Sequence, residues 1–275
     1  MSRLVWDATG ERTYETGLNH GVLYPINAQG EYTPGVAWNG LSSVSESPSG
    51  AEANAIYADN IKYLNLYSAE EFGATIECYT YPDEWMLCDG SASMANGVIA
   101  GQQDRKTFGL CYRTVLGNDV DGDAHGYKLH LIYGCKASPS ERQYQTINDS
   151  PEAITFSYEI STTPINATGF KPLSCITIDS TKADSTKLAA LEEVLYGKDA
   201  VEAADAVYAQ VPADATFDAA KTYYTKDGTT YTAATGLASF ENGTTYYTMT
   251  SPAVEASDAV DPELPLPDRV AEIMG

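Results

Sequence analysis

A tyrosine-rich segment occurs twice near the C-terminal end of this 275-residue chain. Residues 217–225 read FDAAKTYYT and residues 240–248 read FENGTTYYT, so equivalent positions lie 23 residues apart. Such a repeat predicts two copies of one strand unit. Asp227-Gly228, which follows the first copy, is a strong hairpin-turn signal. The repeat therefore predicts a small β module held together by cross-strand tyrosine contacts.

The segments on either side of the repeat mark the limits of this module. Residues 198–214 are rich in Ala, Val and Asp, and residues 251–260 form a second linker. We therefore divide the chain into a body at residues 1–197, an inserted module with its linkers at residues 198–260, and a C-terminal segment at residues 261–275. The candidate functional residues of the module are Tyr223, Tyr224, Tyr246 and Tyr247.

The body reads as a β-rich unit. Glycines punctuate its first 40 residues, which predicts short strands and loops there. Ala74, Ile76 and Cys78 alternate with polar residues, as in a half-buried strand. Residues 107–116 and 127–133 are expected to form a hairpin with a long polar tip at 117–126. Other expected strands are residues 61–66 and a pair at 154–161 and 173–178.

Two helices are expected beside these strands. Residues 82–87 begin with Pro and two acids, which suits the first turn of a short helix that ends at Asp89-Gly90. Residues 185–196 place Leu188, Leu191, Val194 and Leu195 on one face, with Asp184 as N-cap and Gly197 as C-cap. The predicted fold class is therefore mainly β with a flanking α-helix.

The charge of the chain argues against a nucleic-acid-binding surface. The sequence has 16 Lys and Arg against 38 Asp and Glu, a formal net charge of −22. Phosphate binding needs clustered cations, which this composition does not supply. Two interpretations stay open: the charge serves solubility, or it forms a surface that DNA passes without adhering, since like charges repel.

The cysteines and the start of the chain bear on the compartment. Cys78, Cys88, Cys111, Cys135 and Cys175 are an odd number and include no C-x-x-C pair, so we expect reduced core residues. The first residues, MSRLVWD, include no apolar signal region, and no apolar run is long enough for a membrane span. We therefore expect a protein that is first made and kept in the cytosol, without a membrane span.

Enzymatic motifs are missing from the sequence. The chain has 3 His, none of them in a recognisable nucleophile motif, and no Gly-rich phosphate loop. Asp119, Asp121 and Asp123 resemble the start of a calcium loop, but Ala124 and His130 replace the Gly and Glu that such a loop requires. An acidic hairpin tip is the simpler interpretation. We expect neither an enzyme nor a cofactor or metal.

The order of several motifs resembles a known family. The first are VAWNGL at 36–41, YADNIKYL at 57–64, FGATIE at 72–77 and YPDE at 81–84. FGLCYR at 108–113, GYKLHLIYG at 126–134, NDSPEA at 148–153 and TIDST at 177–181 follow in the same order. Together they resemble the major tail proteins, or tail tube proteins, of long-tailed bacteriophages of Gram-positive hosts. The resemblance covers about residues 1–197, and residues 198–260 depart from it.

This resemblance implies a fold and a function. It implies a β-sandwich-like or barrel-like body that assembles as hexameric rings, which stack into the tail tube that conducts DNA during ejection. Tape-measure and tail-terminator proteins would be its partners, and it would reside in the virion tail after assembly in the host cytoplasm. An insertion at 198–260 that leaves stacking undisturbed would lie on the tube exterior.

The alternative from another class is a monomeric β-sandwich that recognises carbohydrate at a surface, since such modules are also rich in tyrosine and strand. The two differ in self-association. For contacts between subunits we single out residues 42–52, expected as an exposed loop, and the segment that follows it. The candidate interface residues are Ser47, Pro48, Tyr57, Asp59 and Asn60.

Overall fold

The computed structural model describes residues 4–147, 149, 153–212 and 215–275. The motif at 148–153 therefore lies largely outside the described residues. The chain divides into two compact units, one made of Met1–Lys198 with Asp261–Gly275 and the other of Asp199–Val260. Strands make up 44% of the chain and helices 10%, which confirms the prediction of a mainly β fold with few helices.

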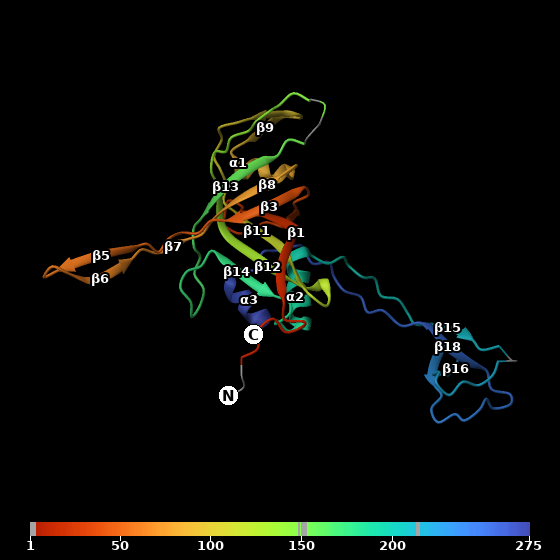
Figure 1. Cartoon of the computed structure of the whole chain (residues 1–275). Coiled ribbons are helices and arrows are strands. Elements are labelled where there is room, and N and C mark those ends of the chain that lie inside the picture. Colours follow the sequence, from red (N-terminus) through yellow and green to blue (C-terminus); the bar gives the residue numbers. More distant parts are fainter. Residues whose placement is uncertain (1–3, 148, 150–152, 213–214) are drawn as a thin grey trace. The chain divides into compact units, whose positions relative to one another are not determined.

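One antiparallel sheet of eight strands organises the first unit (Figure 1). Its order is β2-β1-β11-β12-β13-β8-β3, and β14 pairs with β12 beside this path. Contacts between β1 and β3 show that the sheet curls, because these strands lie near opposite ends of that order. The strands are β1 (Thr13–Pro25), β2 (Val36–Ala37), β3 (Leu41–Glu46), β8 (Gly73–Cys78), β11 (Phe108–Asn118), β12 (Gly122–Ala137), β13 (Phe156–Thr162) and β14 (Cys175–Asp179).

Strand β12 changes partners along its length. Its earlier part, Lys128 to Ile132, pairs with β14, whereas Cys135 to Ala137 pair with β13. Gly134 lies between the two pairings with a φ of 61°. A Cβ added there would lie 2.2 Å from the carbonyl oxygen of Thr163, so only glycine fits without a shift of the backbone.

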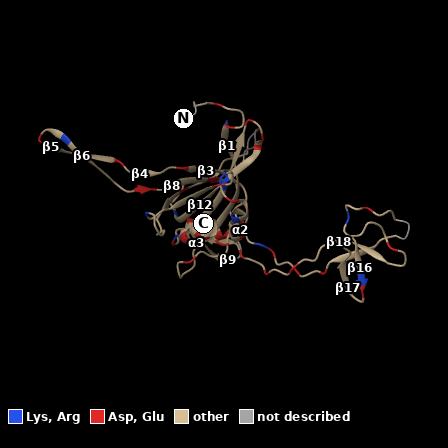
Figure 2. Cartoon of the chain, turned by 90° about the horizontal axis from the view of Figure 1, so that it is seen from below, with Lys and Arg blue, Asp and Glu red and all other residues tan. Residues whose placement is uncertain are grey.

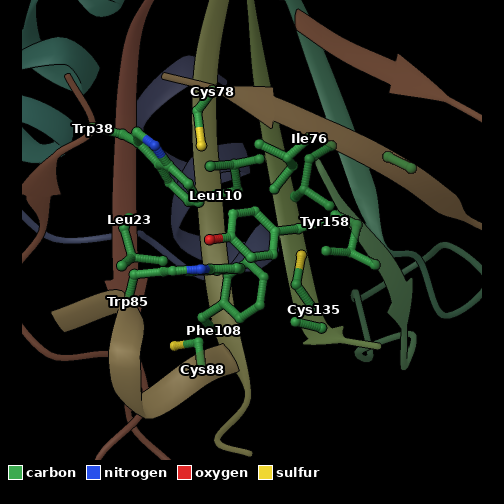
Figure 3. Close-up of a cluster of buried hydrophobic side chains, with 14 of the residues drawn as sticks. Leu23, Trp38, Ile76, Cys78, Trp85, Cys88, Phe108, Leu110, Cys135 and Tyr158 are labelled. Atoms are coloured by element: carbon green, nitrogen blue, oxygen red, sulfur yellow. The ribbon is translucent and has the colours of Figure 1, made fainter. Parts of the chain in front are cut away.

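Two hydrophobic cores form on the sheet. Figure 3 shows the first, where Trp85 lies among Trp38, Phe108 and Tyr158 with ring centroids 4.7, 5.0 and 4.9 Å away. Offset and edge-to-face ring pairs of this kind stabilise a core beyond their buried area. Trp85 is placed by the 3₁₀ turn η1 (Asp83–Trp85), which continues as α1 (Met86–Asp89) and ends at the left-handed Gly90, close to the predicted short helix.

The second core joins the sheet to two helices. Leu188, Leu191 and Leu195 of α2 (Ser185–Tyr196) are buried, and Val194 is half-buried. The Asp184 side chain accepts hydrogen bonds from the backbone N–H groups of Thr186 and Lys187, so this helix and its cap are confirmed. A second helix, α3 (Pro267–Met274), packs against α2. It lies in the C-terminal segment, where no helix was predicted.

Three predictions for the body were wrong. Residues 13–25 form one long strand, because Gly17 and Gly21 lie at register shifts that β1 absorbs as bulges. Residues 42–46 belong to β3, an edge strand paired with β8, because Leu41 and Val44 pack against the first core while Ser42, Ser45 and Glu46 face solvent. Strands β13 and β14 do not pair with each other, since each takes a different part of β12.

Smaller differences follow from strand length and edge position. The hairpin of β11 and β12 is confirmed, but Asn118 still pairs with Gly122, so its tip is shorter than expected. Cys175 is exposed on β14, unlike the other four cysteines, which are buried. A two-stranded β9 (Ala92–Ala95) and β10 (Val98–Ala100) hairpin follows α1.

The second unit is a four-stranded sheet in the order β15-β18-β16-β17. Equivalent residues of the two repeated segments pack into one cluster. In it, Tyr223 and Tyr246 are buried beside Phe217 and Phe240. The hairpin turn is Gly228-Thr229, one residue later than the Asp-Gly signal suggested. The strands are β15 (Val207–Gln210), β16 (Tyr224–Asp227), β17 (Thr230–Ala233) and β18 (Tyr246–Ser251).

Candidate functional site

The strongest candidate site in the first unit is a two-stranded ribbon, here called the arm, at residues 49–71 (Figure 1). Short strands β4 (Ser49–Gly50) and β7 (Glu70–Glu71) pair at its root, and β5 (Ala53–Ala58) and β6 (Ile61–Tyr67) form the ribbon. Among the described residues, β5 and β6 pair only with each other. Both outer edges of the ribbon therefore offer unpaired backbone groups to a partner strand.

The turn of the arm is tight because two adjacent residues adopt left-handed conformations. Asp59 and Asn60 have φ values of 52° and 63° and join Ala58 to its partner Ile61. Positive φ at both central residues is the type I′ geometry, whose twist matches that of the flanking strands. Asp and Asn tolerate this region better than other non-glycine residues, so the sequence fixes the turn locally.

One face of the arm is apolar and is left uncovered by the residues that the structure describes. Ile56 and Leu64 lie opposite each other in register, and Leu66 follows on the same face. These three side chains are 38%, 38% and 53% exposed, respectively. Further large side chains of the arm are also exposed: Tyr57, Ile61, Tyr63 and Tyr67. An isolated two-stranded ribbon is marginal in water, and exposed apolar patches typically mark contact sites.

A polar network joins the end of β3, just before the arm begins, to β11 and β12 of the sheet. Glu46 accepts a hydrogen bond of 2.5 Å from the hydroxyl of Tyr112 and lies 3.5 Å from Nδ1 of His130. The rings of Tyr112 and His130 stack with centroids 4.7 Å apart, and Nε2 of His130 lies 3.0 Å from the Thr114 hydroxyl. The hydrogen bond with His130 is the main cause that lowers the pKa of Glu46. Partial desolvation raises this pKa, and the hydrogen bond from Tyr112 lowers it further.

We expect the substitution Glu46→Gln to destabilise the body at neutral pH by about 1 kcal/mol, a value reduced because Glu46 is partly exposed. A lowered folded-state pKa means that the ionised carboxylate stabilises the fold above its unfolded pKa and that this stabilisation disappears as pH falls through the folded pKa. The difference in thermal midpoint between wild type and variant should therefore be largest above pH 5 and shrink toward pH 3. An unchanged difference across this range would contradict the role of the ionised carboxylate.

The structure places all the predicted interface residues on or beside the arm. Ser47 and Pro48 connect β3 to β4 at its root, and Tyr57, Asp59 and Asn60 lie at its far end. Sequence reasoning missed the apolar face of Ile56, Leu64 and Leu66. The signal was available, because residues 61–66 were expected to form a strand, but its pairing with the segment before Asp59 was not recognised.

In the acidic hairpin tip between β11 and β12, each carboxylate has a different partner. Asp119 accepts a bond of 2.9 Å from the backbone N–H of Gly10, and Asp123 accepts one of 2.9 Å from the hydroxyl of Tyr14. Asp121 lies 3.4 Å from Nδ1 of His125. Within the described parts of the chain, no group of three or more His, Cys, Asp or Glu side chains is arranged to hold a metal ion.

Charge and hydropathy give the remaining features of the surface. Figure 2 shows acidic residues along both units with far fewer basic ones between them. In the portion of the chain that the structure describes, no helix has both the length and the apolar character needed to cross a membrane.

The second unit carries an aromatic face opposite its buried cluster. Neighbouring residues of a strand point to opposite faces, so Tyr224 and Tyr247 lie on the other side from Tyr223 and Tyr246. The rings of Tyr208 and Tyr231 stack 3.9 Å apart, and Tyr231 lies 5.1 Å from Tyr247. All four tyrosines of this face, Tyr208, Tyr224, Tyr231 and Tyr247, are half-buried.

Comparison with known proteins adds no assignment. No protein-family model matches the sequence. No curated protein matches it either.

Proposed function

We propose that the chain is the subunit of a phage-type tail tube, which assembles as stacked rings. The observation that carries this proposal is the arm, whose apolar face and unpaired edges have no cover within the described chain. A second copy of the chain supplies a fitting cover, because an added strand satisfies the open edge while its apolar side chains bury those of the arm. The motif order in residues 1–197 supports the same function.

The charge of the chain suits conduction of DNA. Heterologous contacts between identical subunits close into rings when the rotation closes. A channel wall with a surplus of carboxylates repels the phosphate backbone and retains no DNA. Under this proposal the rings are hexameric, tape-measure and tail-terminator proteins are partners, and the chain performs no catalysis. The assembled protein resides in the virion tail.

Negative-stain electron microscopy of the purified full-length chain at rising concentration tests the proposal. We expect hollow rings and then tubes, with light scattering that grows with protein concentration. Compact monomers at every concentration, also after addition of a tail-initiator complex, would contradict self-assembly. The control is the same series at high salt, which screens the repulsion between subunits of charge −22 and should favour assembly.

The inserted module is expected to be dispensable for assembly. Its linkers run antiparallel, with Val201 paired to Ser257 and Ala204 to Val254, so its entry and exit lie close together. Deletion of residues 199–260 with a short Gly-Ser connection should therefore leave the thermal midpoint of the body within about 3 °C of wild type, because a short loop closes at little entropic cost. Tubes of the deleted chain should have a smaller outer diameter. Loss of tubes from a folded body would show that the module takes part in stacking.

The aromatic face of the second unit favours a second candidate function, recognition of carbohydrate. Half-exposed tyrosine rings offer flat apolar surfaces with polar ends, which suit stacking against sugar rings. A glycan-binding assay separates the two functions: a monomer that binds glycans through Tyr208 and Tyr231 supports the second, whereas tubes that bind none support the first. Replacement of both residues by Ala is the matched loss-of-binding variant.

A further inference from the structure

A polar pocket of about 540 Å³ lies in the first unit beside the short helix α1, apart from the arm. Its wall comes from the end of α1, the segment after β10 and the segment after β12. The polar side chains of this wall include Asp89, Arg105, Ser138, Ser140 and Arg142. Pockets of this volume are typical of sites that take one small group or molecule.

Asp89 and Arg142 form one side of this pocket. They are joined by an ion pair in which the Asp89 side chain is only 5% exposed. The guanidinium of Arg142 also lies 5.9 Å from the ring centre of Tyr158, so it is held by contacts on two sides. The second carboxylate oxygen of Asp89, Oδ1, is buried and has no hydrogen-bond partner among the described residues.

Arg105 forms the other side and lacks a counterpart. Within the described chain it forms no ion pair, and its Nε is buried without a hydrogen-bond acceptor. Its side chain lies over Gly90, where an added Cβ would come within 3.2 Å of both Cγ and Cζ of Arg105. Gly90 has a φ of 84°, so the left-handed end of α1 provides the space in which this guanidinium lies.

We propose that this pocket binds a carboxylate group, which in the assembled protein is an acidic side chain of a neighbouring copy. The guanidinium of Arg105 suits a carboxylate, since its two terminal nitrogens, unlike the buried Nε, can donate to the two carboxylate oxygens. The source rests on the proposed function of self-assembly. With 38 acidic residues against 16 basic ones, most carboxylates of a neighbour have no cation of their own.

The charges in the pocket select a singly charged anion. The two guanidinium groups and the Asp89 carboxylate leave a net charge of one positive unit. A carboxylate balances that charge, whereas a phosphate dianion would bring two negative charges toward the buried, partly unsatisfied Asp89. The hydroxyls of Ser138 and Ser140 add polar groups to the wall without changing its charge.

The first experiment measures binding by the full-length chain below its assembly concentration. Sodium acetate is titrated while backbone amide NMR signals of Gly90, Ser138 and Ser140 are followed, with sodium chloride at matched ionic strength as reference. We expect saturable shifts with acetate alone. They should vanish in Arg105→Gln, weaken in Arg105→Lys, and persist in Arg12→Gln, a control that removes the same charge from an exposed pair with Asp119. Equal shifts with chloride, or saturation that survives Arg105→Gln, would overturn the pocket.

The second experiment measures assembly by light scattering. We expect Arg105→Gln to raise the concentration needed for tubes about tenfold, the effect of one lost charge-assisted bond, and Arg12→Gln to leave it unchanged. Saturable acetate binding with unchanged assembly would overturn the neighbouring copy as the source and assign the pocket to a free small carboxylate. A chain that never assembles would have the same consequence, while the acetate titration would still decide whether the pocket binds.

Discussion

Replacing Leu64 with lysine should raise the protein concentration needed for tube formation at least about a hundredfold, because the variant places an unpaired charge in the contact that the arm forms. The arm contributes no side chain to either core of the body, so the thermal midpoint should stay within about 2 °C of wild type. Electron microscopy and light scattering at matched concentrations measure the effect.

The matched control for this variant is Ile154→Lys. Ile154 is 38% exposed, as is Leu64, but it lies just before β13, outside both the arm and the Arg105 pocket. It should leave tube formation nearly unchanged. If Leu64→Lys assembles at the wild-type concentration, the apolar face of the arm is not the contact surface, and the case for self-assembly loses its main support.

Replacing Trp85 with alanine should destabilise the body by about 3–5 kcal/mol, the usual cost of removing a large buried aromatic side chain. Trp85 is fully buried and contacts three other aromatic rings, so the cavity cannot collapse without moving Trp38, Phe108 or Tyr158. The thermal midpoint should fall by about 10 °C or more for a unit of this size.

Trp6→Ala provides the control for this second variant. The Trp6 side chain is 74% exposed, so its removal leaves no cavity, and the midpoint should change by less than about 1 °C. Circular dichroism at 222 nm during heating measures both variants. A Trp85→Ala protein as stable as wild type would mean that the first core does not depend on the aromatic cluster.

The elements with strong local signals could be predicted from the sequence. The helix at Ser185–Tyr196 combines an apolar face with an Asp cap, and the strand at Gly73–Cys78 alternates cleanly, so each segment encodes its own structure. The repeat likewise predicted strands, because its tyrosines keep the same spacing in both copies. These signals depend on neighbours in sequence and need no knowledge of the partner strand.

The pairing of strands could not be predicted, because it depends on residues far apart in the chain. Nothing local to Lys128 or Cys135 indicates that one strand serves two partners, and the decisive feature is the crowding of Gly134 against Thr163. The candidate site shows the same limit. Tyr57, Asp59 and Asn60 were selected for their position after an expected loop, whereas recognising the apolar face also required the pairing of Ile56 with Leu64.

The change of partners along β12 bears on how the body melts. This one strand supplies Ile132 and Cys135 to the first core and Leu129 and Leu131 to the second, so unfolding of β12 removes side chains from both cores. Separate cores linked only by loops would unfold as independent cooperative units. Because β12 contributes side chains to both cores, we expect the body to unfold as one cooperative unit in calorimetry.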